Sequence, residues 1–200
     1  MFISQKYSHR GAFEELKDTE EWKEITDSIQ AVKLVDHKNK ISKEKNRDGE
    51  MLISPSSVNE AMAKELEHRE WFKKRRTFWL SENVETFRET LYFPEETQKE
   101  LWGDEGIHSY MEIDFWKNHI GMEVQFGKYA FIFHDYVKMK IFYDLGMIDY
   151  GIELVPTRNM KKEMSSGPCY YDQAQLYLLT LEKYLDFPVL LIGVEEKLDK

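Results

Sequence analysis

The chain has 200 residues, of which 42% are hydrophobic, 14% aromatic and 32% charged, and its formal net charge is -9. This composition supplies enough apolar material for a packed core, so it excludes a chain that is disordered as a whole. The negative charge argues against a protein that coats nucleic acid without sequence preference, since such affinity comes from lysine and arginine neutralising phosphates.

Cysteine content and hydropathy indicate the cellular compartment in which the protein is expected. The one cysteine, Cys169, excludes an intrachain disulfide framework and a cysteine-rich zinc site, and it favours a reducing cytosol. The first residues lack a basic region followed by a long apolar one, and no apolar run is long enough to span a bilayer. We therefore expect a cytoplasmic protein with no membrane partner.

We expect a single domain over residues 1–200, with a helical part over about 1–110 and a sheet core over about 111–200. In the first part, a helix over residues 13–34 is predicted by apolar residues at steps of three and four, namely Trp22, Ile25, Ile29 and Val32. Further helices are expected at about residues 83–91 and 95–102.

Another helix of the first half is expected to start after Pro55. Ser57 and Glu60 have the spacing of a capping box. The stripe that follows is predicted to be buried, and it consists of Val58, Met62 and Leu66.

Basic residues are unevenly distributed. Between Lys33 and Arg47, six basic residues stand against two acidic ones, a local charge of +4. The run Lys73-Lys74-Arg75-Arg76 lies among aromatic residues and is able to hold phosphates, but basic clusters are more often solvated faces, and we leave it outside the predicted site.

The second half predicts an α/β fold. Strands are expected at 112–116 and 120–126, with Asn118 and His119 at the bend between them. A largely buried helix at 129–145 is expected next, followed by a strand at 147–155, a loop at 156–168, a helix at 170–184 and a strand at 187–194. This alternation predicts a mixed central β-sheet flanked by helices.

The clearest site candidate lies in the predicted hairpin. Strand alternation puts Met122, Val124 and Phe126 on the core face, and Glu123 and Gln125 on the other. A hairpin partner strand can bring Asp114 beside them. Two converging carboxylates repel each other and are most stable around a divalent cation, for which oxygen ligands suit magnesium or manganese.

Such a metal supports nuclease chemistry, because it lowers the pKa of a bound water and neutralises charge on a phosphodiester. Spacing alone is weak support, since an aspartate and a glutamate nine positions apart are also typical of solvated surface. Further segments of the chain add support for a metal site.

The segments Ile113-Asp114-Phe115 and Glu123-Val124-Gln125-Phe126 resemble the active-site hairpin of type II restriction endonucleases of the BglII/BstYI group. Further similar segments occur in the same order and span most of the chain, namely Ser42-Lys43-Glu44-Lys45, Gly127-Lys128-Tyr129-Ala130-Phe131, Met164-Ser165-Ser166-Gly167 and Tyr170-Tyr171-Asp172-Gln173-Ala174-Gln175.

The resemblance implies the PD-(D/E)XK nuclease fold, in the variant where glutamine replaces the usual lysine. It implies that Asp114, Glu123 and the backbone carbonyl of Val124 bind Mg2+, with Mn2+ as a substitute. It also implies that Gln125 orients the attacking water, since an amide cannot itself act as a base.

By the same resemblance, Lys128 reaches the major groove and Ser165 and Ser166 lie in a loop that contacts DNA. These side chains have the right chemistry to read base edges. Two alternatives stay open: Lys128 as an exposed strand-end charge, and the serine loop as a turn that caps the next helix.

The implied function is a type II restriction endonuclease that cuts double-stranded DNA at a short palindrome. The resemblance suggests a GATC-centred, RGATCY-like site and 5'-phosphate ends. A palindrome fits a homodimer, to which we expect the helix at 129–145 to contribute. The alternatives are a nonspecific repair nuclease and a non-catalytic acidic DNA mimic or scaffold.

Overall fold

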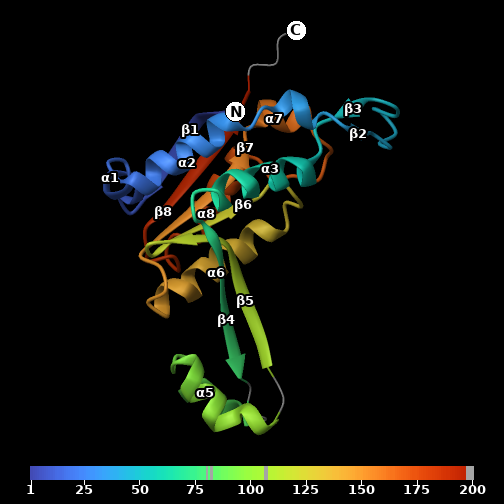
Figure 1. The fold of residues 1–200 in the computed structure, drawn as a ribbon. Coiled ribbons are helices and arrows are strands. Elements are labelled where there is room, and N and C mark those ends of the chain that lie inside the picture. The colour runs from blue at the N-terminus through green and yellow to red at the C-terminus, as the bar shows by residue number, and fades with distance from the viewer. Residues whose placement is uncertain (80, 82, 106–107, 197–200) are drawn as a thin grey trace.

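A six-stranded sheet in the order β1-β8-β7-β6-β5-β4 forms the centre of the computed structural model, which describes residues 1–79, 81, 83–105 and 108–196 (Figure 1). The strands are β1 (Phe2–His9), β4 (Phe72–Trp79), β5 (His108–Lys117), β6 (Ile120–Val124), β7 (Tyr150–Pro156) and β8 (Val189–Glu195). The β6, β7 and β8 strands run parallel, and their neighbours on either side run antiparallel. This confirms the predicted mixed sheet.

Helices cover both faces of the sheet (Figure 1). They are α1 (Ala12–Leu16), α2 (Glu20–Ala31), α3 (Pro55–Glu67), α4 (Val84–Thr90), α5 (Glu95–Trp102), α6 (Phe131–Asp144), α7 (Arg158–Lys162) and α8 (Tyr171–Thr180). One apolar core lies between the sheet and α2 with α3, and a second lies between the sheet and α6 with α8. The strands of the sheet centre are therefore buried on both sides.

Two small parts lie outside these layers. The β4 and β5 strands extend well beyond the rest of the sheet and carry α4 and α5 at their far end (Figure 1). The short strands β2 (Lys40–Ile41) and β3 (Met51–Leu52) form a separate hairpin after a 3-10 turn at Leu34–His37. A second 3-10 turn occupies Gly103–Glu105.

The helical expectation for the first half is right about the buried stripes and wrong about two boundaries. The expected helix over 13–34 is split into α1 and α2, because Thr19 caps α2 by accepting the N–H of Trp22. The α3 helix begins at Pro55 and is capped by Ser54 instead of Ser57. Proline at the first helical position needs no N–H partner, which favours this start.

Four strands in the first half, β1 to β4, are absent from the sequence expectation, so residues 1–110 are not helical throughout. Both β1 and β4 are edge strands of the sheet. Edge strands bury few side chains and often carry charges, so they lack the apolar alternation that predicts a strand. The run Lys73-Lys74-Arg75-Arg76 belongs to β4 for this reason.

The second half follows the predicted order, with one addition. The expected loop at 156–168 contains α7, whose cap Thr157 accepts the N–H of Met160. The apolar helix expected at 129–145 is α6, and it has 14 residues. No helix in the described part of the chain is long and apolar enough to cross a membrane.

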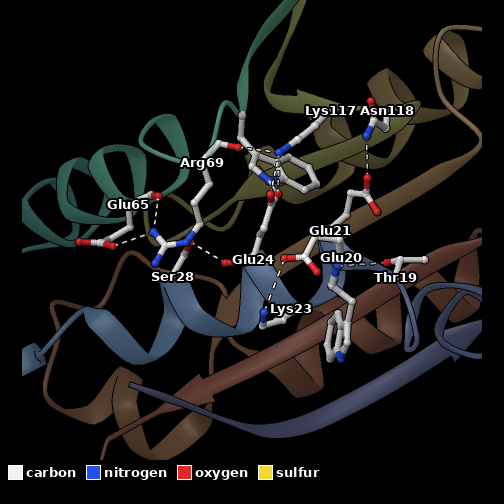
Figure 2. Close-up of polar contacts among 12 residues, drawn as sticks. Thr19, Glu20, Glu21, Lys23, Glu24, Ser28, Glu65, Arg69, Lys117 and Asn118 are labelled. Atoms are coloured by element: carbon white, nitrogen blue, oxygen red, sulfur yellow. Dashed lines mark hydrogen bonds and ion pairs between the residues drawn. The ribbon is translucent and has the colours of Figure 1, made fainter.

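A polar cluster ties α2 to the β5 end of the sheet (Figure 2). Glu24 accepts from Lys117 Nζ at 2.7 Å and from the indole N–H of Trp71 at 2.8 Å. Lys117 also donates to the carbonyl of Arg69 at 2.8 Å. The side chains of Lys117 and Glu24 are each 18% exposed, so water would compensate poorly for the loss of either charge.

Glu24→Gln should therefore lower the free energy of unfolding by about 1–3 kcal/mol, because it leaves the Lys117 ammonium without a charged acceptor. Urea unfolding measures the loss. The matched control is Glu20→Gln on the same helix, where the Glu20–Lys23 pair is largely exposed. Equal stabilities for the two variants would show that the cluster does not anchor α2.

Candidate functional site

The turn between β5 and β6 determines which side chains meet across the hairpin. Asn118 and His119 both have positive φ, at 45° and 62°. This is the two-residue connection that suits the twist of paired strands. The register pairs Lys117 with Ile120 and continues to Phe115 with Met122, and Asp114 and Glu123 lie directly beyond this last pair.

Alternation along β6 separates the core face from the polar face, as predicted. Met122, Val124 and Phe126 belong to the core on the α2 and α3 side. Glu123 faces α6 on the other side of the sheet and is 2% exposed. The backbone N–H of Asp114 lies 3.4 Å from Glu123 Oε1, which confirms that the two strands bring these residues together.

Two buried side chains of α6 contact the polar residues of β6 and the loop that follows. Lys138 Nζ lies 2.6 Å from Glu123 Oε1 and 3.4 Å from Asp135 Oδ1. The amide nitrogen of Gln125 donates to Asp135 Oδ2 at 2.8 Å. The sequence predicts α6 as a largely buried helix that contributes to a dimer contact, and the i, i+3 spacing of Asp135 and Lys138 was the signal available to find this pair.

The amide of Gln125 is held at both ends. Its oxygen accepts from the backbone N–H of Gly127 at 3.0 Å. A Cβ at Gly127 would lie 2.9 Å from that oxygen, so the close approach favours glycine. Gln125 therefore points to Asp135 with its nitrogen and back to its own loop with its oxygen.

Burial and charge alter the acidity of this cluster. Burial, and next the negative charge of Asp114, raise the pKa of Glu123 well above its usual range, against the opposing charge of Lys138. Burial by itself lowers the pKa of Lys138, but the Glu123 carboxylate reverses this, and the pKa of Lys138 is raised. Lys138 therefore keeps its proton and is the cation of the cluster.

Asp114 also reaches a pocket on the other side of the sheet. The pocket has a volume of about 260 Å³, and it is lined by Asn59, Glu60, Ala63, Glu67, Lys73, Asp114, Phe115 and Val124. The side-chain oxygen of Asn59 is buried and has no hydrogen-bond partner within the part of the chain that the structure describes. Asn59 is thus a further site candidate, and it was missed because an amide on an amphipathic helix has no distinctive sequence pattern.

A second buried acid lies beside Glu123. The register of β6 and β7 pairs Glu123 with Glu153, which is fully buried. Both carboxylate oxygens of Glu153 lack a hydrogen-bond partner among the described residues. Burial, followed by the charges of Asp135 and Glu123, raises the pKa of Glu153 well above its usual range, which favours the neutral acid.

The three residues expected to contact DNA lie on loops that touch each other. The N–H of Tyr129, next to the exposed Lys128, donates to the carbonyl of Gly167, next to the exposed Ser166. Ser165 accepts from Lys40 at 3.0 Å, and the N–H of Ser166 donates to Glu44 at 2.7 Å. The first loop follows β6, and the second follows α7, which begins shortly after β7 ends. Since β6 and β7 are parallel, both loops come after the sheet end near Glu123.

Of the weaker candidates, only the basic run on β4 reaches the pocket. Lys73 lines it, and Lys73 also pairs with Glu112 at 2.9 Å. His119 is exposed in the hairpin turn beside Asp149, at the opposite end of β6 from Gln125. His134 is exposed on α6.

The comparison with known families decides the classification. The family model described as restriction endonuclease BglII/BglIII matches residues 4–194. The chain belongs to the restriction endonuclease BglII/BglIII family. The type II restriction enzyme BglII of Bacillus subtilis is 26% identical over 196 residues, which are 95% of this chain and 74% of that enzyme. The chain is thus a restriction endonuclease that cleaves DNA, as the family resemblance implied.

Solved structures of the family share the fold. The crystal structure of restriction endonuclease BglII complexed with a DNA 16-mer matches all of this chain and 79% of that one, with a TM-score of 0.71 and 22% identity. The crystal structure of free BglII matches all of this chain and 82% of that one, with a TM-score of 0.62 and 20% identity. The expected restriction-endonuclease-like fold is confirmed.

Glu153→Gln should stabilise the protein increasingly as the pH rises. A raised pKa in the folded state means that the stability contributed by the neutral acid is present below the ordinary carboxyl value of about 4.5 and is lost at higher pH. The amide mimics the neutral acid at every pH. The stability of the variant relative to the parent should therefore increase between roughly pH 5 and pH 9 in urea unfolding.

The control for this titration is Glu182→Gln, since Glu182 is exposed after α8. It should leave the pH dependence of unfolding unchanged. A Glu153→Gln protein whose stability follows the parent at every pH would show that Glu153 is not held as a neutral acid.

Proposed function

We propose that the chain hydrolyses both strands of double-stranded DNA at a short palindrome and leaves 5'-phosphate ends. The proposed palindrome is GATC-centred and RGATCY-like. The observation that carries the proposal is the meeting of Asp114 and Glu123 across the β5–β6 hairpin, with Gln125 directly after the end of β6. Family membership supplies the reaction class.

The donor set fits a hard divalent cation. Asp114, Glu123 and the carbonyl of Val124 offer only oxygens, and Asn59 brings an unpartnered buried oxygen to the pocket that Asp114 and Val124 line. Within the described ranges, no group of three or more histidine, cysteine, aspartate or glutamate side chains is arranged to hold a metal ion without further ligands. Two carboxylates suit Mg2+, which keeps several waters, and Mn2+ is the expected substitute.

When bound, the cation lowers the pKa of a water and offsets charge on the phosphate. The residues of this chain position the reactants. Gln125 is oriented by Gly127 and Asp135, and its amide nitrogen has a second hydrogen with which to hold a water. An amide does not accept a proton near neutral pH, so Gln125 orients the water without deprotonating it.

Base reading is assigned to Lys128, Ser165 and Ser166. Their two loops are joined by the Tyr129 to Gly167 hydrogen bond, so they would reach one stretch of DNA together. Lysine donates to guanine O6 or N7, and serine donates or accepts. The nearby contacts of Lys40 and Glu44 hold the serine loop in place.

A homodimer is the proposed assembly, because a two-fold protein presents the same contacts to both halves of a palindrome. The outer side of α6 and α8 supports it with exposed apolar residues, namely Phe131, Phe133, Val137, Leu176 and Leu179. Large apolar side chains exposed together on two neighbouring helices are typical of an interaction site. A second copy of α6 and α8 would cover it.

Asp114→Asn and Glu123→Gln should each reduce cleavage by at least about 100-fold, because each removes a charged oxygen from the metal site. DNA binding, measured in Ca2+ by gel shift, should persist, since base contacts come from other loops. Asp149→Asn, at an exposed acid near the start of β7, is the control. Wild-type cleavage by either site variant would contradict the proposed centre.

Digestion of a long, sequenced DNA in Mg2+ tests the sequence preference. We expect discrete fragments whose mapped ends share one palindrome and carry 5'-phosphates. A smear would indicate the nonspecific repair nuclease instead. Intact DNA under all divalent cations tested would favour the acidic DNA mimic or scaffold, for which the charge of -9 is the main support.

Val137→Glu should convert the dimer to a monomer, since it puts a charge into the apolar surface of α6. Sedimentation equilibrium measures the mass. Val35→Glu is the matched control, because Val35 is also exposed but lies on the 3-10 turn after α2. A Val137→Glu protein that remains dimeric would place the interface elsewhere.

A further inference from the structure

We propose that Lys138 of α6 is a positioning residue for the reaction: its ammonium holds the Glu123 carboxylate in place, and Asp135 extends this hold to Gln125. The inference rests on the proposed function, since it concerns how Glu123 and Gln125 are kept ready to act. Neither α6 residue is assigned to contact DNA or metal.

A continuous chain of contacts carries the proposal. It runs from Glu123 Oε1 to Lys138 Nζ at 2.6 Å, from Lys138 to Asp135 Oδ1 at 3.4 Å, and from Asp135 Oδ2 to the Gln125 amide at 2.8 Å. Glu123, Asp135 and Lys138 are each at most 6% exposed. A charge-assisted contact that is closed to solvent fixes geometry far better than an exposed one.

The two oxygens of Glu123 have different partners. Both contacts from the described residues, those of Lys138 and the backbone N–H of Asp114, fall on Oε1. Oε2 receives neither of them. Lys138 therefore fixes the carboxylate through one oxygen and leaves the other available as a ligand.

The charge balance of this region requires a cation. Four acids face it, namely Asp114 on β5, Glu123 on β6, Asp135 on α6 and Glu153 on β7, and Lys138 forms ion pairs with two of them, Glu123 and Asp135. Removing one partner from a buried pair is strongly unfavourable because a charge is left uncompensated. Lys138 thus keeps Glu123 in place before any divalent cation arrives.

Because Asp135 and Lys138 belong to a packed helix, their contacts with Glu123 and Gln125 have a fixed geometry. Asp135 and Lys138 are one turn apart and share the face toward the sheet, while His134 and Val137, which each precede one of them, face outward. The apolar neighbours Ile132, Tyr136 and Met139 are fully buried and fix the helix against the sheet. A rigid helix supports a site better than a loop does.

Lys138→Met tests the proposal, because methionine keeps the length and removes the charge. At a temperature where the variant is folded by circular dichroism, kcat at saturating DNA in Mg2+ should fall about 100-fold. The affinity for DNA in Ca2+ should stay within about threefold, since the base contacts are elsewhere. Lys140→Met on the same helix, where Lys140 pairs with Asp144 and Asp186, is the control and should retain kcat.

A double-mutant cycle gives a readout that needs no activity. In metal-free buffer with EDTA, Lys138→Met should lower the urea midpoint in the parent protein. It should lower the midpoint much less in the Glu123→Gln background, where the partner charge is already gone. An equal shift in both backgrounds would mean that Lys138 does not act through Glu123, and it would overturn the proposal.

Asp135→Asn provides a second variant if Lys138→Met does not fold, because it preserves size and changes the contact to Gln125. We expect a loss of about tenfold in kcat with unchanged DNA affinity. Wild-type kcat in this variant, or in a folded Lys138→Met, would reduce α6 to a structural role and overturn the proposal. If Glu123→Gln itself cleaves normally, the proposed function fails instead.

Discussion

The register of the β5–β6 hairpin is the constraint on which the site depends. Asn118 and His119 adopt positive φ in a two-residue turn, and this turn sets Asp114 across from Glu123. A slip of one residue would move every β6 side chain to the opposite face. Glu123 would then enter the apolar core under α2 and α3, and Met122 would face the buried charges of α6.

Buried negative charge is the second constraint, and it follows from the first. A strand buried on both faces leaves no solvent to stabilise Glu123, so the charge must be balanced from the covering helix. Lys138 supplies that balance, and Asp135 links it to Gln125. Glu153, with no such partner among the described residues, is accommodated as the neutral acid. Burial raises the pKa of both glutamates, but of the two only Glu123 has a basic partner among the described residues.

Strong local periodicity made much of the fold predictable from the sequence. Ile25 and Ile29 were recognised by helical spacing, and Glu123 and Gln125 by strand alternation, because burial on one face leaves a regular pattern. The β4 strand carries Lys73 to Arg76 at a sheet edge, where solvent accepts any side chain and no such pattern arises.

The site was predictable only in part for a related reason. Local spacing predicted that Glu123 and Gln125 share one face. It could not predict which side chains of α6 would contact them. The contacts of Asp135 and Lys138, and the orientation of Asn59 in the Asp114 pocket, depend on tertiary packing between segments far apart in sequence. The match to the BglII/BglIII family supplied the reaction class, which spacing alone did not.

The proposed cleavage of DNA depends most on a divalent cation held by residues of the β5–β6 hairpin. Crystals soaked in Mn2+ and measured at a wavelength where manganese scatters anomalously would locate the ion directly. If the proposed metal site is right, an anomalous peak will lie at bonding distance from carboxylate oxygens of Asp114 and Glu123 and from the carbonyl of Val124. A peak that avoids these residues, with cleavage still dependent on Mn2+ in solution, would contradict it.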